Sequence, residues 1–174
     1  MRKKLAEKDL ENIGKILIKT QILETQIKLF ISLLKVEIKK KYKIEELDEK
    51  SILSNSNTSK KTLGRLMNIL KTELPIFDVI EFQELLNMRN LFVHSFHEKY
   101  LSNNNVDILE TRLFIKNFDK LIVKFIKIFT GLLVISTKIQ IKNKNSTNNL
   151  KKLEFYDLEE YENVFSDFVI NNIK

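Results

Sequence analysis

The chain contains no cysteine, only one proline and only three glycines among its 174 residues. Without cysteine it can form no disulfide, no thiolate nucleophile and no cysteine-based zinc site, so any chemistry must come from nitrogen and oxygen groups. Because proline and glycine are the strongest interruptions of regular structure, their scarcity predicts long helices joined by few turns. A chain of this length is expected to form one domain with a sizeable core.

Uninterrupted apolar segments are also scarce. The most apolar one, residues 121–135, is 15 residues long and contains Lys124 and Lys127, so it is too short and too charged for a bilayer span. It is predicted to be a buried helix. The N-terminal residues have basic side chains but no apolar stretch followed by a small-residue cleavage site, which argues against a secretory signal. We therefore expect a cytoplasmic protein with no membrane segment.

The formal charge of +7 is unevenly distributed. Residues 151–174 carry six acids against three lysines, so residues 1–150 hold the whole excess, with a net charge of +10. A field of this sign attracts polyanions by releasing their counterions, and nucleic acid is the commonest polyanion in the cytoplasm. A lysine-rich solvated surface without a ligand is the simpler alternative.

The apolar residues follow a helical period in five segments, separated by polar segments at 51–61, 102–105 and 142–152. Pro75 ends the second helix, and Asp107 is expected to cap the fourth. The predicted helices cover residues 10–42, 63–74, 77–101, 107–142 and about 155–172.

The fourth predicted helix has two apolar stripes, so it needs two partners. One is the rest of the bundle, and the other is either the C-terminal helix or a second protomer. No segment has the period of a strand, and no internal repeat is found. The sequence therefore predicts an all-α protein, an up-down bundle of four main helices within residues 1–150, with an acidic C-terminal helix within 151–174 packed on the same domain.

Only two histidines are present, His94 and His97, and Arg89, one of only four arginines, lies five positions before the first. Imidazole titrates near neutrality, so His94 could take a proton from a ribose 2′-hydroxyl or give one to a leaving 5′-oxygen. The planar guanidinium of Arg89 can grip a phosphate through two hydrogen bonds. No glycine-rich phosphate loop, metal-spaced histidine pair or nucleophile elbow is present. The residues together predict phosphodiester cleavage that needs no metal and no other cofactor.

The segment RNLFVH, in which Arg89 and Asn90 precede His94 with four residues between the arginine and the histidine, resembles the signature of the HEPN family. The resemblance extends to the order of the predicted helices over most of the chain. It implies a homodimer whose two motifs face each other in one composite active site. Many HEPN proteins are ribonucleases of toxin–antitoxin, abortive-infection and other antiviral systems, so the resemblance implies the same activity, with RNA such as tRNA as the substrate.

On this hypothesis His94 is the general base or acid, Arg89 stabilises the charge of the phosphorane, and Asn90 orients the phosphate or the imidazole. The products carry a 2′,3′-cyclic phosphate and a 5′-hydroxyl. Because cleavage needs both a base and an acid, the second group is His97 or the motif of a second protomer. In a regular α-helix, Asn90 and His94 lie about 40° apart on a face shared with His97, whereas Arg89 lies about 140° from His94 and must reach round.

Other interpretations stay open. His94 and His97 could be half-buried bundle residues, and Arg89 could pair with Glu84 or with an acid of a neighbouring helix. The chain would then be a non-catalytic HEPN module that binds RNA, a nucleotide or a protein, or a purely structural helical adaptor.

Two further expectations concern partners. Lys60, Lys61 and Arg65 are candidates to line an RNA path, with a solvated cationic surface as the alternative. In one subclass of HEPN toxins, a nucleotidyltransferase antitoxin modifies a tyrosine two residues after the motif histidine. Here that position is Phe96, and the nearest tyrosine is Tyr100. This departure puts control by tyrosine modification in doubt and leaves a different antitoxin or a defence-system partner open.

Overall fold

The computed structural model describes residues 5–45, 47–48, 52, 63–101, 107–143 and 158–173, and every regular element in these residues is a helix. The predicted all-α class is therefore confirmed for this part of the chain. The predicted polar segments at 51–61, 102–105 and 142–152 lie largely outside the described residues. The elements are α1 (Glu7–Ser32), α2 (Val36–Tyr42), α4 (Leu63–Glu73), the 3-10 turn η1 (Pro75–Phe77), α5 (Ile80–Asn90), the π-helical η2 (Leu91–Ser95) and η3 (His97–Leu101), α6 (Ile108–Asn143) and α8 (Glu159–Asn172).

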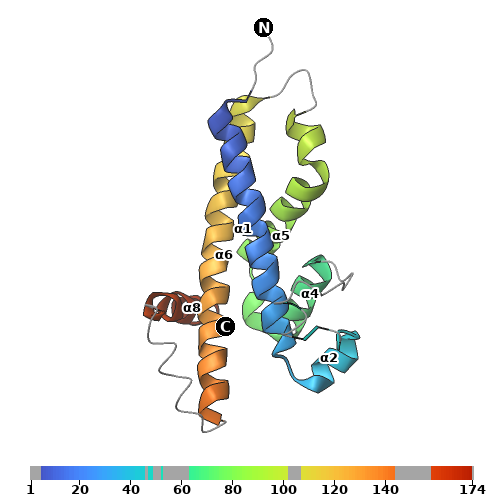
Figure 1. Ribbon diagram of the computed structural model, residues 1–174, viewed down its shortest axis with the longest axis vertical. Coiled ribbons are helices and arrows are strands. Elements are labelled where there is room, and N and C mark those ends of the chain that lie inside the picture. The colour runs from blue at the N-terminus through green and yellow to red at the C-terminus, as the bar shows by residue number, and fades with distance from the viewer. Residues whose placement is uncertain are drawn as a thin grey trace.

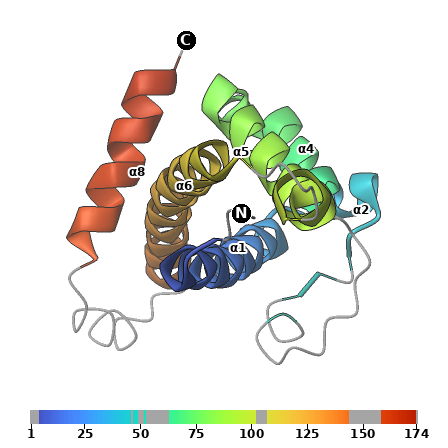
Figure 2. The same cartoon turned by 90° about the horizontal axis from the view of Figure 1, so that it is seen from above.

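The two longest helices, α1 and α6, lie side by side and run in the same direction (Figure 1). Asp9 of α1 binds Arg112 near the start of α6, and Gln26 donates to Thr130 further along both helices. The segment α5–η2–η3 runs in the opposite direction beside them, and the three together surround a core (Figure 2). We call this segment the motif segment, because it carries Arg89, His94 and His97.

The first helix does not continue to residue 42, as its apolar period predicts. α1 ends at Ser32, and the chain turns through Lys35 (φ −55°, ψ 147°) before α2 begins. α2 lies beside α4, where the Tyr42 hydroxyl donates to a carboxylate oxygen of Glu73 at 2.7 Å. The same apolar spacing suits a straight helix and a folded one, and contacts between residues distant in the sequence decide between them. The third predicted helix likewise begins later than expected, at Ile80, because Phe77 belongs to η1.

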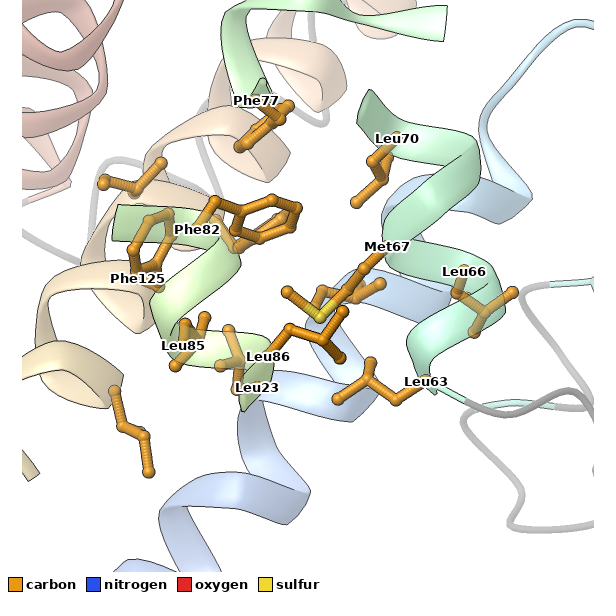
Figure 3. Packing of buried hydrophobic residues seen from close by; sticks show 14 of the residues in the cluster. Leu23, Leu63, Leu66, Met67, Leu70, Phe77, Phe82, Leu85, Leu86 and Phe125 are labelled. Atoms are coloured by element: carbon orange, nitrogen blue, oxygen red, sulfur yellow. The ribbon is translucent and has the colours of Figure 1, made fainter. Parts of the chain in front are cut away.

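Aromatic rings fill the centre of the core, where residues of α5, α6 and η1 meet. Phe77 and Phe129 stack with their ring centroids 5.2 Å apart, and Phe82 lies 5.2 Å from Phe125. Side chains of α4 point into the same core (Figure 3). The first apolar stripe predicted for the fourth helix is buried at every position, namely Ile115, Phe118, Ile122, Phe125, Phe129 and Leu132.

The C-terminal helix α8 packs on the outer side of α6. Its Phe168 is buried and lies against Phe125, with a centroid distance of 6.2 Å. The helices approach closely at Gly131, where a Cβ would lie 2.0 Å from the carbonyl oxygen of Tyr161. Lysines of α6 pair with acids of α8, as in the 2.5 Å contact between Lys127 and Glu160. In its C-terminal half, α6 therefore finds its second partner in α8.

Within the described residues, no helix combines the length and the apolar character needed to cross a membrane. Residues 121–135 lie inside α6, between the core and α8. Their prediction as a helix packed within the bundle is confirmed.

Candidate active site

The motif residues lie where the helix changes its winding. α5 is a regular α-helix up to Asn90, and the wider π-helical pattern follows in η2 and again in η3. In a π-helix each N–H bonds to the carbonyl five residues back instead of four. The π-helical part begins at Leu91, which lies between Arg89 at the end of α5 and His94.

Aromatic rings fix one side of the motif segment against α6. Phe92 lies 5.4 Å from Phe118, and Phe96 lies 5.6 Å from Phe114, measured between ring centroids. Tyr100 packs on Phe114 in the same way, at 5.3 Å. Because this side is buried, the exposed polar residues of the motif segment lie on its other sides.

Both histidines are exposed, His94 in η2 and His97 in η3. The alternative that they are half-buried bundle residues is therefore wrong. An exposed imidazole can meet a substrate without any rearrangement of the helix that carries it. Asn90, the last residue of α5, is exposed as well.

Arg89 is held by the neighbouring helix α1. Its Nε and Nη2 both donate to Oε1 of Glu24, at 3.0 and 2.6 Å, and its Nη1 lies 3.4 Å from Oδ1 of Asn90. The side chains of Arg89 and Glu24 are only 17% and 24% exposed, so the pair is shielded more than a typical surface ion pair. The acid that pairs with Arg89 is therefore Glu24 of a neighbouring helix, not Glu84.

The surface next to the motif is open and apolar. Leu17 lies seven residues before Glu24 and Leu10 seven before Leu17, so all three share one side of α1. Leu10 and Leu17 are 55% and 48% exposed, and Val93, the neighbour of His94, is 45% exposed. Large apolar side chains grouped in this way are typical of a surface that another molecule covers.

The arrangement offers a fixed cation, an amide and two exposed imidazoles on adjoining helical turns. A guanidinium and an amide can hold a phosphate, and an imidazole can move a proton at neutral pH. These are the groups that cleavage of a phosphodiester needs.

The three basic side chains predicted to line an RNA path differ in their surroundings. Lys60 and Lys61 lie outside the described residues. Arg65 is exposed in α4, and its Nη2 donates to the carbonyl oxygen of Tyr42 at 2.6 Å, which caps the end of α2.

Sequence reasoning did not find Glu24. One signal was present, since Glu24 is the only acid between Glu11 and Glu37 and stands on the predicted helix seven residues after an apolar position. The pattern did not reveal which arginine or lysine the acid would meet, because that depends on the packing of α1 against α5.

Among the residues described, no group of three histidine, aspartate or glutamate side chains could hold a metal ion. No protein-family model, no curated protein and no solved structure matches this chain. The resemblance to the HEPN family therefore depends on the motif residues and on the order of the helices around them.

Proposed function

We propose that this chain is a HEPN-type endoribonuclease that cleaves RNA, such as tRNA, without a metal. The observation that carries the proposal is the placement of Arg89, which Glu24 fixes, five residues before the exposed His94 on one continuous segment whose π-helical part begins between them. π-helical turns are rare, and they occur frequently at functional sites. The all-α architecture, with the motif segment beside the long helices α1 and α6, supports the proposal.

The reaction follows from these groups. A histidine removes the proton of the 2′-hydroxyl, the 2′-oxygen forms a bond to phosphorus, and the bond from phosphorus to the 5′-oxygen breaks as a second histidine protonates that oxygen. Arg89 stabilises the charge of the phosphorane, and Asn90 orients the phosphate or the imidazole. His94 takes one of the two proton-transfer roles. The products are a 2′,3′-cyclic phosphate and a 5′-hydroxyl.

The second histidine is the His94 of another protomer, with His97 as the alternative within one chain. The exposed apolar side chains of Leu17 and Val93 support a homodimer, because a partner seated there would cover them and bring a second motif close by. The composite cleft would then hold two arginines and two histidines.

We further propose that the protein acts in the cytoplasm as a toxin or antiviral effector and is controlled by an antitoxin or a defence-system partner. Control by tyrosine modification has little support. The position two residues after His94 is Phe96, and the hydroxyl-bearing Tyr100 is only 5% exposed.

One observation favours a different function. Because Glu24 neutralises Arg89, the arginine could be a structural residue, and the chain would then be a non-catalytic HEPN module that binds RNA, a nucleotide or a protein. The two functions differ in whether RNA is turned over.

The test is cleavage of total RNA and of a labelled tRNA pool by the purified protein in the presence of EDTA. His94→Ala should lower the rate by about 10² to 10⁴, and Arg89→Ala by about 10² to 10³. Ser95→Ala is the matched control, because Ser95 is an exposed neighbour of His94 on the same helix. Cleavage that depends on His94 and Arg89 and leaves cyclic phosphates supports the proposal. Absence of cleavage, or equal cleavage by all variants, overturns it in favour of the binding module.

A further inference from the structure

A cavity of about 530 Å³ lies between the N-terminal parts of α1 and α6. We call it the α1–α6 cleft. At 100° per residue, its lining residues Lys15 and Lys19 lie about 140° to 180° round α1 from Leu17 and from Glu24, which binds Arg89 of the motif segment. The cleft is therefore on the other flank of α1 and does not belong to the candidate active site.

The cleft is cationic. Its charged lining residues are five cations and two acids, Lys8, Lys15, Lys19, Arg112 and Lys116 against Asp9 and Asp119.

Three of the cations are fixed in place by acids. Arg112 donates to both carboxylate oxygens of Asp9, and Lys19 lies 2.6 Å from Asp119. Lys15 pairs with Glu11 at 2.5 Å. The Arg112–Asp9 and Lys19–Asp119 pairs join the two walls of the cleft, whereas the Lys15–Glu11 pair lies within α1.

The other two cations, Lys8 of α1 and Lys116 of α6, are exposed and less constrained. Lys8 acts on Asp9 and Glu11 through its charge, but no direct ion pair holds either lysine among the residues that the structure describes. They stand on opposite walls and are free to bind an anion that enters between them.

The residues that line the α1–α6 cleft limit the kind of anion that it can bind. Its apolar floor consists of Ile16 and Ile115, which are 1% and 6% exposed and so offer little surface to a ligand. None of the described lining residues is aromatic, so no ring is available to stack on a base. Lys15 and Lys19 on one wall are four residues or about 6 Å apart, as are Arg112 and Lys116 on the other wall. This spacing suits successive phosphates of a strand better than one compact ligand.

We infer that the α1–α6 cleft binds the sugar–phosphate backbone of a single RNA strand at a distance from the motif histidines. The choice of RNA as the polyanion rests on the proposed function, whereas the cationic cleft does not depend on cleavage. Contacts to phosphates alone position a strand without reading its sequence. The protein would therefore hold long RNA at two places and short RNA only at the active site.

The test measures binding with the full chain carrying His94→Ala, so that no substrate is consumed. The probe is a labelled single-stranded RNA of about 20 nucleotides, titrated at salt concentrations from about 50 to 200 mM. The cleft variant is Lys8→Glu with Lys116→Glu. Its matched control is Lys40→Glu with Lys142→Glu, two exposed lysines outside the cleft whose change alters the net charge equally. Helicity of both variants is checked by circular dichroism.

We expect the cleft variant to bind at least about tenfold more weakly and its salt slope to fall by about 1.4, the value for two lost phosphate contacts on a single strand. The control should change far less, and single-stranded DNA should bind nearly as well as RNA. An equal loss of RNA affinity in the cleft variant and its control, or no loss of affinity in the cleft variant, would overturn the inference. Tight binding of ATP without binding of the strand would also overturn it.

Failure of the proposed nuclease activity would give a different result from failure of strand binding at the α1–α6 cleft. With His94 intact, the cleft variant should cleave a dinucleotide as fast as the unchanged protein does, because a dinucleotide is too short to reach the cleft. Loss of all cleavage together with intact strand binding contradicts the nuclease and leaves the cleft in place.

Discussion

A single carboxylate oxygen of Glu24 accepts hydrogen bonds from both Nε and Nη2 of Arg89. This pairing fixes the plane of the guanidinium and leaves Nη1 toward Asn90. It also balances the charge of Arg89, so a substrate phosphate must compete with a carboxylate that is already in contact. Glu24 thus becomes a positioning residue for the proposed reaction, and the pair can be tested apart from the motif itself.

Glu24→Gln removes the charge of the carboxylate but keeps a carbonyl oxygen that can accept. We expect kcat to fall about ten- to a hundredfold, because small misplacements of a catalytic group have effects of this size. The free energy of unfolding should fall by about 1 to 2 kcal/mol through loss of charge-assisted hydrogen bonds. Single-turnover cleavage and urea denaturation measure the two effects.

The charge swap Glu24→Arg with Arg89→Glu separates structure from catalysis. It rebuilds an ion pair between α1 and α5, so stability should recover relative to either single change, while cleavage should not. If cleavage recovered as well, Arg89 would be only a structural residue and its role in the reaction would be wrong.

Much of the fold could be predicted from the sequence, because burial of apolar side chains imposes a period that can be counted. The stripe from Ile115 to Leu132 is buried as expected, and Asp107 caps α6 through hydrogen bonds from the N–H groups of Leu109 and Glu110. The turn between α1 and α2 could not be predicted in this way. The apolar period continues through it, and only packing beside α4 selects the folded form.

The candidate site was predictable in its residues but not in its geometry. The exposure of His94 agrees with a catalytic role, but the acid that holds Arg89 lies on α1, far from the motif in the sequence. The π-helical pattern has no signal in the sequence, and the contact with Glu24 depends on how α1 packs against α5.

Leu17→Glu tests the proposed dimer. A charge at this exposed position next to the motif should convert the protein to a monomer and abolish cleavage, with less than about 0.5 kcal/mol lost from the stability of the monomer. Ile170→Glu is the control, because Ile170 is 71% exposed on α8, which packs on the outer side of α6. Sedimentation velocity reports the mass of each variant. A Leu17→Glu protein that remains a dimer would place the interface elsewhere.

The ion pair between Asp9 and Arg112 predicts a dependence of stability on pH. Hydrogen bonds from Arg112, and next from the Ala6 N–H, hold the pKa of Asp9 below its usual value of 3.8. A pKa that is lower in the folded state contributes stability above about pH 4, and this contribution is lost as the pH falls through the lowered value.

Asp9→Asn should therefore lower the melting temperature at pH 7, and the difference from the unchanged protein should shrink as the solution is acidified below pH 4. Asp167→Asn, at an exposed position of α8, is the control. Thermal melts followed by circular dichroism give both curves. A difference that stays constant down to the acid limit would contradict the lowered pKa.

Alanine substitutions at two glycines in long helices are expected to have opposite effects on the stability of the protein. A methyl group at Gly131 would lie 2.0 Å from the carbonyl oxygen of Tyr161 and 2.8 Å from Cβ of Phe165, whereas nothing lies within 4 Å of a methyl group at Gly14. Gly131→Ala should therefore destabilise the protein by about 1 to 3 kcal/mol, because α8 must move outward. Gly14→Ala should stabilise it by about 0.5 to 1 kcal/mol, because alanine loses less backbone entropy in a helix. Both are measured by urea denaturation, and a stabilising Gly131→Ala would mean that α8 does not pack on α6 at this distance.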